Sequence, residues 1–323
     1  MRIPFMALLA VILLLGSAPA MPAETYPARP IKLIVPFAPG AGSDLMGRFA
    51  AQQLSERLGQ TVIVENKPGA GSALGVDLVA KAKPDGYTLL WTASDGASIA
   101  PAVKSGLRYR IPDDFAFIAR ISDFPYIITV NPALPIHNLA EFLAYAKANP
   151  GKLRYGTAGI GSGSHLATEL VSKAAGVELT HVPFGGIGPA TQAAIGGHIE
   201  VIFGAPSIKA YTDAGKLRAI AMTGARRDPN FPDLPTLAEA GMPGVVVTIW
   251  WGILAPAETP APILARLREV TDEMMRDPKT AEGLRRIGYE PSYLPHDKFR
   301  EFVLRDVQQW RSVARSANIK VED

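Results

Sequence analysis

The sequence has no cysteine in its 323 residues. This absence excludes a disulfide framework, a thiolate nucleophile, an iron–sulfur cluster and a lipid attached through cysteine. The 33 Lys and Arg residues are scattered among 30 Asp and Glu residues and form no basic run, so a nucleic-acid partner is not expected. With 48% hydrophobic and 20% charged residues, the composition is typical of a globular protein, and the length predicts two domains.

Motifs for catalysis and metal binding are also missing. The chain has no G-x-S-x-G elbow, no G-x-x-x-x-G-K-[ST] phosphate loop and no H-E-x-x-H helix. None of its histidines lies at metal-ligand spacing from another; they are His137, His165, His181, His198 and His296. The sequence therefore predicts a protein that is not an enzyme and has neither cofactor nor metal, with a secreted hydrolase or isomerase as the minor alternative.

Long apolar runs are absent after the N-terminus. Residues 3–15 are apolar, follow Arg2, and lead into a small-residue stretch in which Ala18 and Ala20 fit signal-peptide cleavage. A membrane anchor is the alternative, but the run is shorter than the roughly 20 residues that span a bilayer. We predict that residues 1–20 are a signal peptide and that the mature protein is free in the periplasm, since no cysteine can carry a lipid.

The rest of the chain alternates short β-rich runs, glycine turns and amphipathic stretches, which is typical of an α/β fold. Strands are predicted at residues 31–36, 62–64, 87–91, 117–121, 126–130, 153–157, 179–182, 201–203, 217–222 and 245–254. The C-terminal part is mostly helical and cannot form a core alone. We therefore predict a discontinuous first lobe of residues 24–125 plus 225–323, a second lobe of residues 126–224, and a ligand crevice between them.

Three turns share the pattern G-x-G-S, and each precedes a predicted helix: residues 40–43, 69–72 and 159–162. Glycine permits positive φ and close approach to the main chain, and the unpaired amides of a helix N-terminus favour an anion. A tight turn with a serine N-cap is the alternative for any single loop. No Lys or Arg lies inside these tetrapeptides, so backbone amides and hydroxyls are expected to bind a carboxylate.

One acidic and one aromatic residue near these turns have an alternative structural interpretation. Asp44 follows the first turn and is interpreted as complementing the helix dipole. In the loop 181–189, Phe184 is a candidate apolar wall and the amides of Gly185 and Gly186 are candidate ligand contacts, or else Phe184 is core and the glycines only turn the chain. His165, just after the third turn, is the one histidine expected near a ligand.

Several segments together resemble the Bug family, the substrate-binding proteins of tripartite tricarboxylate transporters. The resemblance covers essentially the whole mature chain. Its motifs are VPFAPGAGSD at residues 35–44, VENKPGAG at 64–71, PDGYTL at 84–89, YGTAG at 155–159, GSGSHL at 161–166, VPFGG at 182–186, LPTLAEAG at 234–241, WWG at 250–252 and APAETP at 255–260.

The resemblance implies a type II periplasmic binding fold, a two-lobed Venus flytrap. It also implies a small organic carboxylate ligand and delivery of this ligand to the integral-membrane permease subunits of a tripartite system. We expect the mature protein to be monomeric. By the family pattern, the ligand loops contain Phe37, Gly42, Ser43, Asp44, Thr157, Gly161, Ser162, His165, Phe184, Gly185 and Gly186.

The sequence departs from this pattern in three places. The family usually has two adjacent glycines where this sequence has Gly40-Ala41-Gly42. It often has Tyr-Lys-Gly where this sequence has Phe-Gly-Gly at residues 184–186, and it commonly has Asp at the position of Glu200. The second departure removes a cation, so ligand selectivity does not transfer from relatives. Ser94 and Asp95 lie where members differ in ligand contacts, and Asp95 is a candidate acceptor for a ligand ammonium group. A flytrap that presents its ligand-bound form to a signalling receptor is the alternative function.

Overall fold

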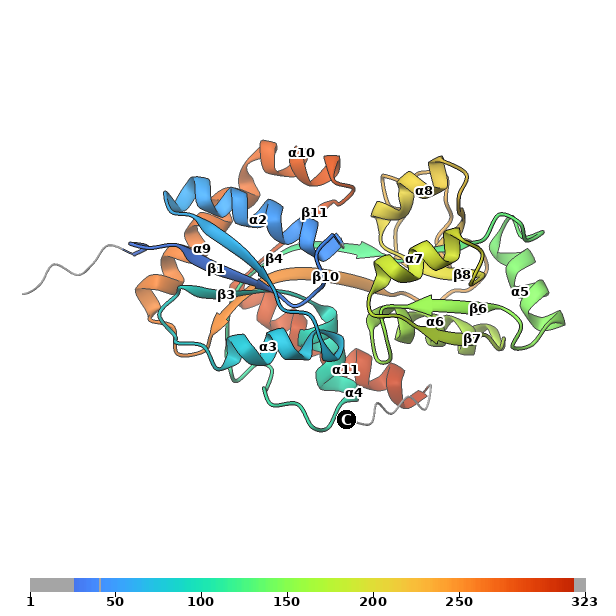
Figure 1. The fold of residues 1–323 in the computed structure, drawn as a ribbon, viewed down its shortest axis with the longest axis horizontal. Helices are drawn as coiled ribbons and strands as arrows, with labels where there is room; N and C mark the ends of the chain where they lie inside the picture. Colours follow the sequence, from blue (N-terminus) through green and yellow to red (C-terminus); the bar gives the residue numbers. More distant parts are fainter. Residues whose placement is uncertain (1–25, 41, 317–323) are drawn as a thin grey trace, which may run out of the picture.

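The computed structural model describes residues 26–40 and 42–316. Figure 1 shows two α/β lobes side by side, each built around its own sheet. The predicted signal peptide lies outside the described residues. Within the two described ranges, no helix has the length and apolar character needed to cross a membrane.

The sheet of the first lobe has, among the described residues, six strands in the order β11-β4-β10-β3-β1-β2. They are β1 (Ile31–Val35), β2 (Val62–Asn66), β3 (Thr88–Ala93), β4 (Phe115–Pro125), β10 (Thr248–Pro256) and β11 (Pro291–Pro295). β1 is parallel to β2 and β3, whereas β10 is antiparallel to β3 and β4.

The second sheet, counted over the same described residues, has five strands in the order β7-β6-β8-β5-β9. They are β5 (Ile127–Val130), β6 (Arg154–Thr157), β7 (Thr180–Pro183), β8 (Val201–Gly204) and β9 (Arg218–Met222). Strand β5 follows the crossing from the first lobe and is antiparallel to its neighbours β8 and β9. Strand β10 follows the crossing back from the second lobe and is likewise antiparallel to its neighbours β3 and β4. The two sheets therefore share one arrangement over five strands, to which the first lobe adds β11.

Helices cover both faces of both sheets (Figure 1). In the first lobe they are α2 (Gly42–Leu58), α3 (Ala73–Ala80), α4 (Ala100–Val103), α9 (Ala261–Arg276), α10 (Pro278–Arg286) and α11 (His296–Ser316). In the second they are α5 (Leu139–Ala148), α6 (Gly163–Ala175), α7 (Ile187–Ile195) and α8 (Lys209–Asp213). Short helical turns add η1 (Ala70–Ser72), η2 (Asp95–Ile99) and η3 (Pro206–Ile208).

The alternation of side chains along a strand explains how one sheet serves two hydrophobic clusters. Trp251 packs with the cluster under α2 and α9, whereas its neighbour Trp250 packs with the cluster under α3 and α11. Trp250 is fully buried, meets Phe299 edge-on at 5.0 Å between ring centres, and donates from Nε1 to Asp306 at 2.7 Å. Trp250 therefore ties β10 to the C-terminal helix.

Thr223 connects the two segments that cross between the lobes. Its backbone amide donates to the Tyr126 carbonyl at 2.9 Å, and its hydroxyl accepts from the Tyr126 amide at 2.9 Å. The same hydroxyl donates to the Val247 carbonyl at 2.6 Å, and the Val247 amide donates back to Thr223 at 2.8 Å. Because the side chain of Thr223 is fully buried, these bonds hold the crossing strands in register without competition from water.

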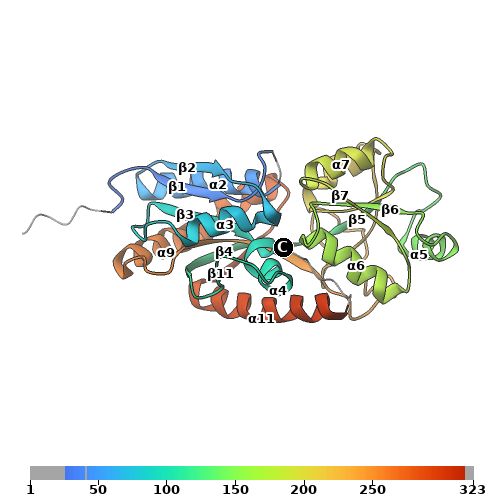
Figure 2. The same ribbon diagram turned by 60° about the horizontal axis from the view of Figure 1, so that its bottom comes forward.

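The C-terminal helices pack on the first lobe, as the sequence predicted. Leu267 and Val270 of α9 and Phe299 and Val303 of α11 are core residues there. Figure 2 shows α11 lying along one side of the first lobe and reaching the region below α6. The predicted lobe boundaries at residues 125/126 and 224/225 stay predictions.

Most predicted strands are present, but one begins at a different residue and one observed strand was not predicted. The sequence places a strand at residues 245–254, whereas β10 begins at Thr248, because Val245 and Val247 lie in the crossing segment and are buried without joining the sheet. Strand β11 was missed, since prolines at both of its ends hide an edge strand from a pattern search. Asn138 is the N-cap of α5, and its side chain accepts from the Glu141 amide at 2.9 Å.

Candidate functional site

The glycine-rich turns lie at the carboxyl ends of parallel strands, where open α/β sheets bind ligands. β1 leads into α2 and β3 into η2 in the first lobe, and β6 leads into α6 and β7 into α7 in the second. The predicted site residues therefore belong to strand-to-helix loops on both lobes. They differ in what their side chains already contact.

The first loop is organised by Asp44, which is buried at the start of α2. Its carboxylate accepts from the Gly40 amide at 3.0 Å, from Arg48 Nε at 3.0 Å and from Asn66 Nδ2 at 2.9 Å. Burial opposes ionisation, but these hydrogen bonds outweigh it and lower the pKa of Asp44. Asp44 thus shapes the loop and neutralises Arg48, in line with its interpretation as a first-turn residue.

The other predicted residues of this loop are placed around it. Phe37 is half-buried against the core, and its carbonyl accepts from Asn66 Nδ2 at 3.0 Å. A side chain at Gly42 would collide with the Tyr289 hydroxyl, so glycine is required for the α2 start to approach this ring. Ser43 Oγ is buried and has no hydrogen-bond partner among the described residues.

The second G-x-G-S turn adopts an unusual backbone. Gly69, Ala70, Gly71 and Ser72 have φ values of 139°, 49°, 62° and 76°, so two non-glycine residues occupy the left-handed region. Ser72 makes no side-chain cap to α3, and a Cβ at Gly96 would lie 2.8 Å from Ser72 Oγ. The turn is thus packed against η2, and Ser72, although it stands at the N-cap position of α3, makes no capping hydrogen bond.

Ser94 and Asp95, the predicted ligand selectors, have different surroundings. Ser94 is fully buried, and its hydroxyl accepts from the Trp250 amide at 3.1 Å, so it supports the sheet. Asp95 is partly exposed and reaches across to the other lobe, where Oδ1 accepts from the Gly163 amide at 2.8 Å. Gly163 is the first residue of α6, so a first-lobe carboxylate is bound at the N-terminus of a second-lobe helix.

The loop before α6 is held by its own side chains. Ser162 is the N-cap, accepting from the His165 amide at 3.4 Å, and Gly161, at φ 75°, donates its amide to His165 Nδ1 at 3.1 Å. Thr157 is fully buried and its hydroxyl lies 2.7 Å from His181 Nε2. His181 was expected only as part of a neighbouring loop, and it joins this network because β6 and β7 are adjacent.

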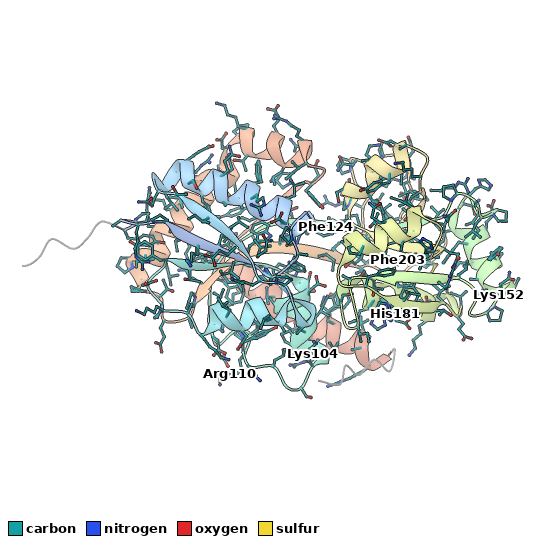
Figure 3. The ribbon with its side chains drawn as sticks, viewed as in Figure 1. Lys104, Arg110, Phe124, Lys152, His181 and Phe203 are labelled. Carbon is teal, nitrogen blue, oxygen red and sulfur yellow. The ribbon has the colours of Figure 1, made fainter. Side chains whose placement is uncertain are left out.

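Three rings form a stack behind this loop. His165 and His181 are parallel with centres 4.1 Å apart, and Tyr155 stacks on His181 at 4.9 Å. Tyr155 donates its hydroxyl to Glu169 in a short hydrogen bond. Burial lowers the pKa of His165. Burial and the neighbouring His165 lower the pKa of His181 to about 4, so the stack is uncharged at neutral pH. Figure 3 shows His181 within the second lobe.

The third predicted loop lies at the start of α7. Phe184 is half-buried against a second-lobe cluster and donates its amide to the Thr157 carbonyl at 3.2 Å. Gly185 is exposed with open space around its Cβ direction, and Gly186, at φ 153°, precedes α7 with no side-chain cap. Phe184 thus belongs to the wall of the second lobe, and the glycines leave the amides of the α7 start without a side-chain cap.

Residues that the sequence did not single out complete the contact between the lobes. Tyr289 packs edge-on against Trp251 at 4.6 Å and donates its hydroxyl to Ser207 of the second lobe at 3.1 Å. The ring centres of Phe124 and Trp251 lie 4.5 Å apart, and Figure 3 shows Phe124 at the side of the first lobe that faces the second. Trp251, and not Trp250, therefore faces the α2 loop. Tyr289 carried no sequence signal, because its neighbours are distant in the chain.

Acid is expected to destabilise the second lobe through His181. His181 has a lower pKa in the folded chain, about 4, than in the unfolded chain, about 6.5. Its contribution to stability is therefore fully present above about pH 6.5 and is lost as the pH falls toward about 4. The free energy of unfolding should therefore fall in this window, by less than about 1.4 kcal/mol per pH unit because His181 is partly exposed and solvent screens its charge. Urea denaturation at pH 7, 5.5 and 4.5 measures this slope.

Two variants make the test specific. His181→Phe keeps a ring in the stack but cannot titrate, so its slope should be shallower than that of the parent. His137→Gln removes an exposed histidine and should leave the slope unchanged. An equally steep slope in His181→Phe would show that another group carries the acid sensitivity.

Two α/β lobes whose sheets share a five-strand arrangement, with glycine-rich helix starts at their junction, define a two-lobed ligand-binding protein. A family model described as the tripartite tricarboxylate transporter family receptor matches residues 46–319, and the chain belongs to this family. The sequence prediction of the family is therefore confirmed. Within the described residues, no group of three or more His, Asp or Glu side chains is arranged to hold a metal ion.

Known relatives are similar over nearly the whole chain. BugT from Bordetella pertussis is 34% identical over 313 residues, which is 95% of each protein. The structure of R. palustris Rpa4515 with adipate is 31% identical, with a TM-score of 0.88 over 91% of this chain and 99% of that one. MatC from Rhodopseudomonas palustris with bound malate is 31% identical, with a TM-score of 0.82 over 89% and 99%.

These relatives confirm the predicted fold class, the type II periplasmic binding fold with two lobes. The family consists of periplasmic binding proteins and not of enzymes, which confirms the prediction that the chain is a binding protein. The role of each predicted site residue stays a prediction.

Proposed function

We propose that this chain is a periplasmic solute-binding protein that captures a small organic carboxylate between its lobes. The observation that carries the proposal is the contact between Asp95 and the Gly163 amide, because it demonstrates that the α6 start accepts a carboxylate oxygen where the lobes meet. The backbone amides at the start of α7, which no side chain caps, and those at the glycine-rich start of α2 offer further hydrogen-bond donors to a carboxylate. Two structural relatives hold adipate and malate, both small carboxylates.

Delivery to the membrane subunits of a tripartite tricarboxylate transporter completes the proposal. Family membership supports this partner. We further propose that residues 1–20 direct export, that the mature protein is monomeric, and that Gly42, Gly161, Gly185 and Gly186 contribute backbone contacts to the ligand. Uptake of the ligand by cells should require both this chain and the membrane subunits, and retained uptake after deletion of this chain alone would exclude the delivery role.

A thermal-shift screen of carboxylates tests the binding claim. A ligand present at 100 times its Kd stabilises the folded protein by roughly 2.7 kcal/mol, which raises the Tm by several degrees in a chain of this size. We expect at least one mono-, di- or tricarboxylate or amino acid to give this shift, and matched uncharged amides to give none. A melt that no carboxylate shifts would contradict the proposed function.

A further inference from the structure

Asp95 occupies an unusual position for a carboxylate. It lies in η2 of the first lobe, and its Oδ1 meets the first amide of α6 in the second lobe at 2.8 Å. The approach is close: a Cβ on Gly163 would lie 2.6 Å from the Tyr126 hydroxyl and 2.8 Å from Ile249 Cδ1. The Asp95 carboxylate therefore reaches the second lobe at a point where Gly163 packs closely against Tyr126 and Ile249.

The charge of Asp95 has no counterion among the described residues. Its own amide and that of Gly163 are the groups that stabilise its ionised form, and no Lys, Arg or His contributes. Two buried acids differ from Asp95: Asp44 pairs with Arg48 at 3.0 Å, and the charge of Arg120 favours the ionised form of Asp306. Asp95 is partly exposed, and with one external amide donor and no cation it carries an uncompensated negative charge at the junction of the lobes.

The second oxygen of Asp95 is also available. Hydrogen bonds within the described part of the chain assign an external donor to Oδ1 and none to Oδ2. An ionised carboxylate accepts up to about four hydrogen bonds. A donor with a positive charge would both complete this acceptor set and supply the missing counterion when the lobes close.

We propose that Asp95 accepts the ammonium group of the ligand, so that the ligand is a carboxylate that also carries an amine, such as an amino acid. This inference rests on the proposed function and names the ligand class of the same site. The backbone amides of the glycine-rich helix starts bind the carboxylate end, which needs no cation from the protein. Asp95 then discriminates against simple dicarboxylates, whose second negative charge would approach its own.

Matched ligand pairs and one isosteric substitution test the assignment. The mature protein is titrated calorimetrically with a panel of L-amino acids, each paired with the acid that lacks only the amino group, such as glutamate with glutarate and aspartate with succinate. The amino member of the best pair should bind at least about tenfold more tightly, as expected for a charge-assisted hydrogen bond. In Asp95→Asn this preference should disappear, while the affinity for the deaminated acid stays unchanged or rises.

Each other outcome overturns a defined claim. Tight binding of a deaminated acid with no preference for its amino partner would refute the ammonium role and leave the proposed function standing. An equal loss of both affinities in Asp95→Asn would show that Asp95 is only a contact between lobes. Binding of neither kind of acid would contradict the proposed function, and this inference with it. Asp213→Asn, which alters an exposed carboxylate on α8, serves as the control and should change neither affinity.

Discussion

Gly163→Val is expected to weaken ligand binding by roughly 5- to 150-fold, which corresponds to about 1–3 kcal/mol of overpacking. The valine Cβ would lie 2.6 Å from the Tyr126 hydroxyl, 2.8 Å from Ile249 Cδ1 and 3.2 Å from Ile99 Cδ1. Since these atoms face α6 from the first lobe and the crossing segment, the lobes cannot approach as closely. Calorimetric titration with the ligand found in the screen measures the loss, and far-UV circular dichroism should stay unchanged.

Ala148→Val is the matched control for this variant. Ala148 also lies in a second-lobe helix, but it is exposed, and its helix α5 lies at the end of this lobe that is remote from the first lobe (Figure 1). Its substitution should change affinity by less than about threefold, since surface changes are usually within about 0.5 kcal/mol. Parent-like affinity in Gly163→Val would show that the α6 start does not close against the first lobe when ligand binds.

Trp250→Ala should have the largest effect on stability, about 3–5 kcal/mol of the free energy of unfolding. The side chain is fully buried between β10 and α11, so truncation leaves a cavity beside Phe299 and removes the donor at 2.7 Å from Asp306. Urea denaturation followed by far-UV circular dichroism measures the change, since it does not depend on the removed fluorophore.

Trp250→Phe separates the two contributions. The phenyl ring keeps most of the packing but cannot donate to Asp306, so a smaller loss of about 1–3 kcal/mol is expected. Burial raises the pKa of Asp306, and the Trp250 hydrogen bond opposes this, so the loss of the donor should make the carboxyl easier to protonate. Ile160→Ala, which trims an exposed side chain, should change stability by less than about 0.5 kcal/mol. Equal stability of Trp250→Ala and the parent would contradict this account of the C-terminal helix.

Local signals in the sequence predicted most elements of this fold. Asn138 and Ser162 were predictable helix starts because an N-cap acts on amides only three residues away. The β-rich runs predicted strands because each strand is buried by its own side chains. The return of the C-terminal helices to the first lobe followed from the apolar faces of Phe299 and Val303, which had no other core to join.

The site was predictable as a set of loops but not as a set of contacts. Glycine patterns identified the turns at Gly42 and Gly161, since positive φ or close approach is a local requirement. The partners of Asp44 and Ser94 could not be predicted, because Asn66 and Trp250 reach them from other strands. Hydrogen-bond partners at such separations depend on the sheet order and the strand register.

The sequence by itself determined the class of this protein: no cysteine, two series of α/β units, glycine-rich helix starts and a family pattern along the whole mature chain. Only the tertiary structure decided which side chains are already engaged. It brought Asp95 of the first lobe to Gly163 of the second and, among residues 26–40 and 42–316, placed no cation beside the carboxylate. The physical reason is that backbone propensities act over a few residues, whereas a buried charge is balanced by whatever the fold brings near it.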